Sequence, residues 1–315
     1  MGPRTFVIVN PLSGGGRTGR RWPQLRRALD PLLDTWDHAF TLGPQDATRL
    51  ARQAVEQGYE QVVAVGGDGT QHEVVNGLFR VEEDPKTPPE PLRPDLVFVP
   101  VRFGTGGDFA RHLGLPARLP AAVQHIESGR TRPVDLGVVA FVDRTGAPRR
   151  QIFVNVASFG LSGLVDQKVN ASTKRLGGLS FLSATFRALA EFRPVRTQIR
   201  VDGQPFYEGR VVTAAAANGT TYGGGMRVAP RACIDDGLLD LVVQTRAGLY
   251  ETARVRQLYD GRSAEWPSVR IGRGRVIEAE TLSRQPVLLD VDGEALGVLP
   301  ARFEVLPGSL RLKAP

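Results

Sequence analysis

A glycine-rich segment early in the sequence has the composition of a phosphate-binding loop. Residues 66–70 read Gly-Gly-Asp-Gly-Thr and directly follow Gln61–Val65, a valine-rich run typical of a buried strand. Glycines let the backbone approach a ligand closely, and the free N–H groups of a helix that begins near Thr70 would favour an anion. A carboxylate beside phosphates is repelled unless a cation or a hydroxyl lies between them, so Asp68 indicates a magnesium-nucleotide. A plain strand-to-helix turn is the simpler alternative.

Two more loops of this kind lie in the first third of the chain. Asn10–Gly16 follows one predicted strand, and Phe103–Phe109 follows another. In the first loop, Asn10 and Ser13 would supply hydrogen bonds to a nucleotide. Each loop alone is equally consistent with a flexible turn. Three such loops at one edge of a parallel sheet are a much stronger indication of a nucleotide site.

Acidic turns stand out in the second half of the sequence. Asp235–Asp240 reads Asp-Asp-Gly-Leu-Leu-Asp, residues 292–294 read Asp-Gly-Glu, and the glycine-rich run Thr221–Met226 precedes both. Hairpin turns explain the two acidic segments from spacing alone. Glu294 is equally able to act as a general base for a hydroxyl, provided that the fold brings it to the nucleotide.

The elements that carry the first three loops alternate between strands and helices over about 135 residues. Such alternation predicts a parallel sheet with its loops gathered at the carboxyl ends of the strands. Glu82–Asp95 is rich in proline and is expected to be an exposed insertion. The predicted strands are Thr5–Asn10, His38–Leu42, Gln61–Val65 and Leu96–Pro100, and the predicted helices are one with Pro23 near its first turn, Gln45–Gln57 and Gln71–Phe79.

After Asp135 the pattern changes to short β-rich segments separated by turns, with one helical interruption near Leu179–Phe192. The sequence therefore predicts a second, β-rich domain with a boundary near Asp135. The predicted strands are Leu136–Val142, Gln151–Val156, Thr197–Val201, Arg210–Ala217, Leu238–Gln244, Ser268–Ile271, Arg275–Ala279, Pro286–Val291 and Arg302–Val305.

Composition excludes several classes of protein. The chain has 315 residues, of which 41% are apolar and 23% are charged. These fractions are typical of a globular protein and exclude a fibrous or disordered chain. Cys233 is the one cysteine, so the chain cannot be stabilised by internal disulfides. A net charge of +7 indicates an anionic partner of unspecified kind. Nucleic acid is not expected, because aromatic residues do not alternate with basic ones. The lack of a signal sequence or a long apolar run predicts a cytoplasmic protein whose membrane contact is peripheral.

The ordered set of motifs resembles the diacylglycerol kinase catalytic family, which includes bacterial lipid kinases and sphingosine kinases. The resemblance spans nearly the whole chain. The motifs are Asn-Pro-x-Ser-Gly at 10–14, GGDGTxxEVVNG at 66–77, GTGGDFAR at 104–111, GGGM at 223–226, DDGLLD at 235–240 and VDGE at 291–294.

This resemblance implies an α/β nucleotide domain related to NAD kinase, followed by an antiparallel β-sandwich that binds lipid, with the active site between them. The expected limits are residues 1–134 for the first domain and 135–300 for the second. The last strand, 301–315, is expected to return to the first domain. Bacterial members are often dimeric, which allows a homodimer here as well.

The family's functional positions carry over to this sequence by motif. Glu294 resembles the proton acceptor, with Asp292 beside it, and Asp68 would lie near the phosphates and their Mg²⁺. A second, structural Mg²⁺ would be held by the Asp236 carboxylate and the backbone carbonyls of Cys233 and Leu238. The expected ATP contacts are Asn10, Pro11, Leu12, Ser13, Gly14, Thr41, Gly66, Gly67, Asp68, Gly69, Thr70, Gln71, His72, Glu73 and Thr105.

One motif departs from the family pattern. The third loop has two extra residues, and Gly107 stands where the family has Asn. Arg102 would add a positive charge near the phosphates.

Taken together, the motifs predict an ATP- and Mg²⁺-dependent kinase of a lipid alcohol such as diacylglycerol, which meets its substrate at the membrane surface. Two alternatives stay open: an NAD kinase, which shares GGDGT, and a catalytically silent protein that binds nucleotide or lipid. The sequence does not specify the acceptor lipid, because an apolar cleft leaves few marks in sequence.

Overall fold

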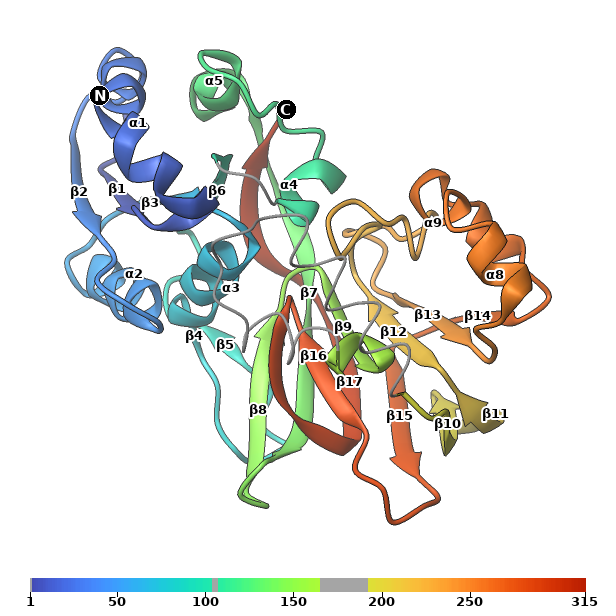
Figure 1. Ribbon diagram of the computed structural model, residues 1–315. Helices are drawn as coiled ribbons and strands as arrows, with labels where there is room; N and C mark the ends of the chain where they lie inside the picture. Colours follow the sequence, from blue (N-terminus) through green and yellow to red (C-terminus); the bar gives the residue numbers. More distant parts are fainter. Residues whose placement is uncertain (1, 104–106, 165–191) are drawn as a thin grey trace.

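The computed structural model describes residues 2–103, 107–164 and 192–315 (Figure 1). Its first part is a parallel sheet in the order β6-β3-β1-β2. The alternating apolar residues of β1 and β3 face two separate cores, one under α1 and α5 and the other under α2 and α3. The elements are β1 (Thr5–Val9), α1 (Ser13–Leu29), β2 (Trp36–Phe40), α2 (Asp46–Glu56), β3 (Gln61–Gly66), α3 (Asp68–Gly77), β6 (Val97–Arg102), α4 (Asp108–His112) and α5 (Ala121–Ser128).

The second part is antiparallel. Apolar side chains from most of its strands pack together in a separate core. One ladder runs β14-β13-β12-β9-β16-β17, and β11-β10-β15 joins β17 farther along, at Ala301–Glu304. Its elements are β7 (Arg130–Asp143), β8 (Pro148–Phe153), β9 (Val156–Gly160), β10 (Val195–Val201), β11 (Gln204–Val211), β12 (Thr213–Ala217), β13 (Leu239–Gln244), α8 (Leu249–Ala253), α9 (Gln257–Asp260), η2 (Arg262–Glu265), β14 (Val269–Gly274), β15 (Val276–Thr281), β16 (Leu288–Val291) and β17 (Glu294–Ala314). The predicted combination of an α/β part and a β part is confirmed.

Two long strands, β7 and β17, pair along most of their length and run from the β part into the α/β part (Figure 1). At its far end β17 lies parallel to β6, with Arg311 opposite Val97. This pairing supports the expectation that the chain's last residues return to the first domain. The boundary itself, near residue 134, stays a prediction, because β7 crosses it without a break.

Several element boundaries differ from those predicted. Helical geometry in α1 begins after Gly14–Gly16, which have φ between 61° and 78°, so Pro23 lies inside the helix and not in its first turn. The third helix begins at Asp68 and not at Gln71. The predicted strands Gln151–Val156 and Arg210–Ala217 are each divided between two strands.

The β part also holds short elements that the sequence did not predict. The helices α8 and α9 belong to this group. In the α/β part, the sequence likewise did not predict the two-stranded pair of β4 (Phe79–Arg80) and β5 (Glu90–Pro91). The predicted helix near Leu179–Phe192 lies, except for its last residue, outside the described residues. In the part of the chain that the structure describes, no helix is long and apolar enough to cross a membrane.

Candidate active site

The first two glycine-rich loops are tied together at the carboxyl ends of β1 and β3. The Asn10 side-chain amide donates to the Thr70 hydroxyl over 3.0 Å, while its oxygen accepts the backbone N–H of Leu12. The Ser13 hydroxyl lies 2.5 Å from that of Thr18, which in turn donates to the carbonyl of Phe103. The two loops therefore present one continuous backbone surface at the sheet edge.

The helix α3 begins directly at this edge. Its N-cap, Gly67, is extended, so the first N–H groups of α3 open toward the loop. Such N–H groups and the positive end of the helix dipole favour a phosphate. Thr41, another predicted contact, is buried beside the same edge, and its N–H donates to the carbonyl of Val9.

The Asp68 carboxylate holds the third loop. It accepts the backbone N–H groups of Gly107 and Asp108 at 2.9 Å and that of Phe109 at 3.1 Å, which belong to the N-cap and the first two residues of α4. These bonds fix the position of Asp68 and use three of its roughly four lone-pair sites. The predicted contact Thr105 lies outside the described residues.

A residue that the sequence analysis did not assign, Asp108, joins this loop to the β part. Its carboxylate accepts the N–H of Gly224 at 2.7 Å and pairs with Arg111, and its carbonyl accepts the Thr221 hydroxyl. The pKa of Asp108 is raised, mainly because the carboxyl group is buried and also because the negative charge of Asp68 is close. The glycine-rich run Thr221–Met226 is therefore part of the site, although only its composition had drawn attention to it.

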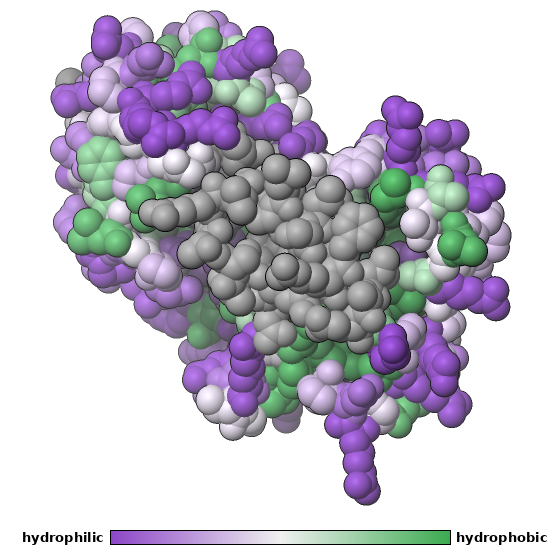
Figure 2. All heavy atoms as spheres, in the orientation of Figure 1, coloured by the Kyte–Doolittle hydropathy of each residue, from purple (hydrophilic) through white to green (hydrophobic). Residues whose placement is uncertain are grey.

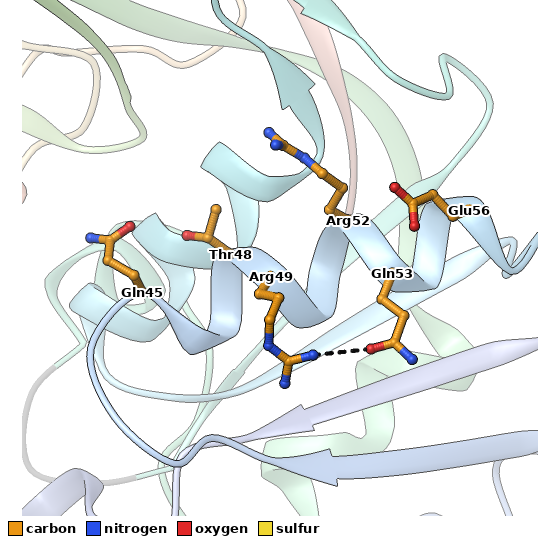
Figure 3. Close-up of a pocket in the computed structure, with 6 residues that line it drawn as sticks. All are labelled: Gln45, Thr48, Arg49, Arg52, Gln53 and Glu56. Atoms are coloured by element: carbon orange, nitrogen blue, oxygen red, sulfur yellow. Dashed lines mark hydrogen bonds between the residues drawn. The ribbon is translucent and has the colours of Figure 1, made fainter.

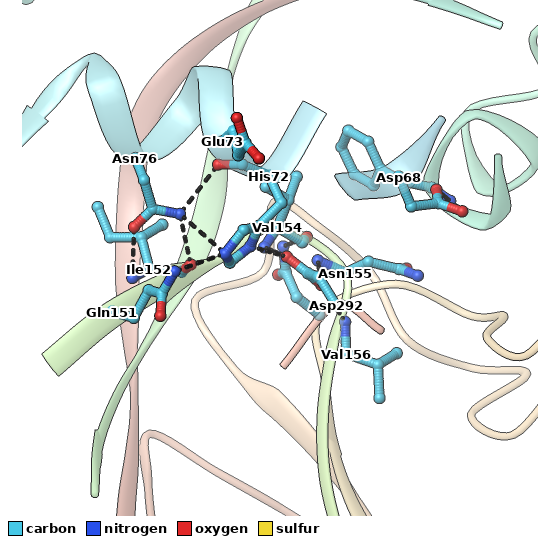
Figure 4. A network of polar contacts seen from close by, with 12 residues as sticks. Asp68, His72, Glu73, Asn76, Gln151, Ile152, Val154, Asn155, Val156 and Asp292 are labelled. Atoms are coloured by element: carbon cyan, nitrogen blue, oxygen red, sulfur yellow. Dashed lines mark hydrogen bonds and ion pairs between the residues drawn. The ribbon is translucent and has the colours of Figure 1, made fainter. Parts of the chain in front are cut away.

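The turn between β16 and β17 contacts α3 at His72, one helical turn after Asp68. Asp292 has a φ of 50°, and its carboxylate accepts the backbone N–H groups of Val154, Asn155 and Val156 at 2.8–3.0 Å (Figure 4). These three N–H groups lie where β8 ends and β9 begins. The predicted strand Gln151–Val156 is divided at this point because its N–H groups bond to Asp292. Asp292 therefore anchors the turn, and its oxygens do not point freely into the site.

His72 completes this anchor from α3. Its Nδ1 lies 2.9 Å from the Asp292 carboxylate, and its Nε2 lies 2.7 Å from the side-chain amide of Gln151 (Figure 4). Burial alone lowers the pKa of His72. The hydrogen bond and charge of Asp292, with the charges of Glu294 and Glu73, outweigh that effect and raise the pKa above its ordinary value. Both ring nitrogens are thus occupied by the protein.

Glu294 is brought to the first turn of α3 by this anchored hairpin. It pairs with Val291 at the start of β17. A Cβ atom placed on Gly69 would lie 3.8 Å from Glu294 Oε1. The structure thus joins the predicted base to the GGDGT loop, although 225 positions separate Gly69 from Glu294 in the numbering.

Two predicted ATP contacts in α3 have other surroundings. The Glu73 carboxylate accepts the N–H groups of Gln45 and Ala47 at 3.0 and 3.1 Å, so it caps the start of α2. Gln71 is 1% exposed, and neither its amide oxygen nor its nitrogen has a hydrogen-bond partner among the described residues.

The acidic turn Asp235–Asp240 is neutralised by arginines. Asp236 pairs with Arg273 and accepts the N–H of Leu238, while Asp235 pairs with Arg132 and accepts the Cys233 thiol at 2.8 Å. Among the described residues, no group of three or more His, Cys, Asp or Glu side chains could hold a metal ion. The Asp236 carboxylate does not fit a cation in this arrangement, because Arg273 already supplies the positive charge.

A shallow depression on the outer face of α2 is separate from this chemistry. It has a volume of about 480 Å³ and is lined by Gln45, Thr48, Arg49, Arg52, Gln53 and Glu56 (Figure 3). All six residues come from one helix or its N-cap, and none of them lies in the loops or the turn described above. It is therefore not a candidate for the catalytic centre.

Comparison with known proteins extends over both parts of the chain. Residues 4–139 match the model of the diacylglycerol kinase catalytic domain, and residues 155–314 match that of the YegS C-terminal NAD kinase beta sandwich-like domain. A diacylglycerol kinase of Bacillus subtilis (strain 168) is 29% identical, with 95% of this chain and 92% of the relative covered. A probable lipid kinase YegS-like protein of Stenotrophomonas maltophilia (strain K279a) is 31% identical, with 99% and 96% covered.

Solved structures show the same architecture. Two structures of a diacylglycerol kinase from Bacillus anthracis str. Sterne superpose with TM-scores of 0.75 and 0.69 at 25% and 22% identity, and each alignment covers 99% of this chain and 97% of the other. Yeast NADH kinase superposes with a TM-score of 0.53 at 12% identity, over 100% of this chain and 84% of the other. The likeness to yeast NADH kinase concerns the fold alone.

Proposed function

The chain belongs to the diacylglycerol kinase family of lipid kinases, and on this premise we propose that it transfers the γ-phosphoryl group of ATP to the hydroxyl of a lipid alcohol such as diacylglycerol, with Mg²⁺. The observation that carries this proposal is the position of Glu294. The anchored turn of the β part places this carboxylate against Gly69, in the first turn of the helix that follows the GGDGT loop.

The nucleotide would lie along the sheet edge that the first two loops form. Backbone N–H groups of Asn10–Gly14 and Gly66–Thr70 would receive its phosphates, with Thr41 nearby, and Thr105 stays a contact predicted from sequence alone. Arg102, which lies beside Gly107, and Arg111, which pairs with Asp108, would add positive charge near the phosphates. Phosphoryl transfer needs mainly positioning and charge neutralisation, and these groups are suited to both.

Asp68 is suited to a Mg²⁺ ion that accompanies ATP. Three N–H groups orient its carboxylate and leave about one lone-pair site, and Mg²⁺ in nucleotide sites commonly takes one or two carboxylates together with phosphates and water. When bound, Mg²⁺ would neutralise charge on the phosphates. The second, structural Mg²⁺ at Asp236 stays a prediction that requires Arg273 to move, and we assign it no role in the reaction.

Glu294 would act as the general base. It would take the proton of the lipid hydroxyl while the hydroxyl oxygen forms a bond to the γ-phosphorus and the bond from that phosphorus to the β-bridging oxygen breaks, releasing ADP. Asp292 would not touch the substrate. Its three backbone bonds and its pairing with His72 hold the turn that presents Glu294.

The test is ATP consumption with diacylglycerol, ceramide, a sphingoid base and a polyprenol as acceptors, in the wild type, Glu294→Gln and the exposed control Glu280→Gln. We expect Glu294→Gln to lower kcat by about 10²- to 10⁴-fold with ATP affinity unchanged, and the control to match the wild type. Equal activity in all three proteins would remove Glu294 from its role. NADP formation from NAD and ATP would favour an NAD kinase, and ATP binding without turnover on any lipid would favour a silent binding protein.

A further inference from the structure

We propose that the surface segment Arg246–Arg262, which carries α8 and α9, docks the protein on an anionic lipid membrane. This docking segment joins β13 to η2 at the edge of the β part (Figure 1). The inference rests on the proposed function, because a kinase of membrane-embedded alcohols must meet its substrate at the bilayer surface.

Exposed apolar side chains gather on the docking segment. Leu249 is 91% exposed, Val255 50%, Tyr259 52% and Tyr250 44%, all within eleven residues of the chain. Single exposed apolar residues are common on soluble proteins, but a group of them indicates a surface that binds a membrane or another protein. Hydrophobic residues appear as green among purple over α8 and α9, at the right of Figure 2. Tyrosine is enriched where proteins meet the membrane interface.

The charges of the docking segment favour an anionic membrane. It holds four arginines, at 246, 254, 256 and 262, against two carboxylates. Both carboxylates are already bound: Glu251 accepts the N–H of Gly248 and the Ser268 hydroxyl, and Asp260 pairs with Arg262 over 2.7 Å. The other three arginines form no ion pair with any described residue. Apolar side chains beside basic ones match the acyl and phosphate layers of an anionic leaflet.

The docking segment is held in place and connects to the active site. The guanidinium of Arg254 lies 3.9 Å from the centre of the Tyr250 ring, whose other neighbour is the buried Trp266. The carbonyl of Leu258 accepts the N–H of Arg227 at 2.7 Å, immediately after the loop Thr221–Met226. That loop donates to Asp108, next to Asp68. A membrane bound here would therefore lie beside the elements that build the site.

The experiment is co-sedimentation with vesicles of phosphatidylcholine alone and of phosphatidylcholine with phosphatidylglycerol. We expect the wild type to bind the anionic vesicles, and Arg246→Gln with Arg256→Gln to bind them about 25-fold more weakly, at about fivefold for each arginine. The triple variant Leu249→Ser, Val255→Ser, Tyr259→Ser is expected to lose binding by about tenfold or more. Salt should weaken binding of the wild type more than that of the arginine variant.

Two matched controls change the same chemistry elsewhere. Arg26→Gln with Arg27→Gln removes two exposed arginines from α1, and Leu282→Ser removes an exposed apolar side chain from the loop between β15 and β16. Both should bind vesicles like the wild type, and all variants should unfold at the same temperature. Equal weakening by Arg26→Gln with Arg27→Gln would show general electrostatic attraction and overturn the assignment to the docking segment.

Activity separates this inference from the proposed function. The docking variants should phosphorylate a dispersed short-chain diacylglycerol at the wild-type rate and lose activity only on vesicles. A wild type that binds anionic vesicles but phosphorylates no lipid alcohol would refute the proposed function and leave the surface standing. If the docking variants bind vesicles and phosphorylate lipid on them like the wild type, the assignment of membrane binding to the docking segment is wrong. The proposed function is not affected by that result.

Discussion

His72 and Asp292 form a buried pair, with Nδ1 and Oδ2 2.9 Å apart, although 220 positions separate them in the sequence. Their side chains are 1% and 2% exposed. One belongs to the helix that follows the GGDGT loop, and the other to the turn that carries Glu294. The pair therefore fixes the distance between the nucleotide loop and the proposed base.

Replacing His72 should misplace Glu294 without removing a group that touches substrate. We expect His72→Ala to lower kcat by about 10²-fold with little change in KM for ATP, because small displacements of reacting groups are costly. His72→Gln should recover part of the loss, since an amide N–H can still donate to Asp292. His125→Ala removes a buried histidine that bonds the carbonyl of Pro100, and it should affect stability alone. An equal effect of His72→Ala and His125→Ala on kcat would argue for a merely structural role.

The same pair makes stability depend on pH. Because the folded-state pKa of His72 is raised above 6.5, the protonated ring stabilises the fold. This contribution is complete below pH 6.5 and is lost as the pH rises through the folded-state pKa. The difference in free energy of unfolding between the wild type and His72→Gln, measured in urea, should shrink across that rise. A difference that stays constant with pH would show that folding does not raise the pKa of His72.

Glu73 should matter for the start of α2 more than for ATP. Glu73→Ala removes both acceptors of the Gln45 and Ala47 N–H groups, so we expect it to reduce the free energy of unfolding by about 1–2 kcal/mol. KM for ATP should not change. Glu56→Gln, at the exposed far end of α2, is the control and should be neutral. A raised KM with normal stability would instead make Glu73 an ATP contact.

Two adjacent glycines should respond differently to a methyl group. A Cβ on Gly66 would collide with the side chain of Thr70, which accepts the Asn10 amide, whereas a Cβ on Gly67 would meet nothing within 4 Å. Gly66→Ala should therefore destabilise the fold by about 1–3 kcal/mol. Gly67→Ala should leave the unfolding temperature unchanged and weaken ATP binding, which calorimetry would measure. Unchanged ATP affinity in Gly67→Ala would show that phosphates do not approach this backbone.

Local pattern was enough to predict much of the molecule. The spacing of apolar residues and the turn residues predicted the strands that precede the three glycine-rich loops. They also predicted the change to β structure after Asp135. The motif order led to the lipid kinase family, which the comparisons confirm. Boundaries were less exact, because a bond from a distant residue ends an element as effectively as a local signal does. The division of Gln151–Val156 by the Asp292 carboxylate is such a case.

The roles of the polar side chains could not be read in the same way. The sequence assigned nucleotide or catalytic roles to Asp68, His72, Glu73 and Asp292. In the structure, the side chain of each of these residues forms hydrogen bonds with a distant segment of the chain. A buried charged or polar group must find a partner, and tertiary structure alone decides which one lies within reach. The sequence by itself thus determined the family, the fold class and the glycine-rich loops, because backbone conformation and apolar period are local properties. Only the tertiary structure decided that Glu294 lies against the GGDGT helix and that His72 and Asp292 hold it there.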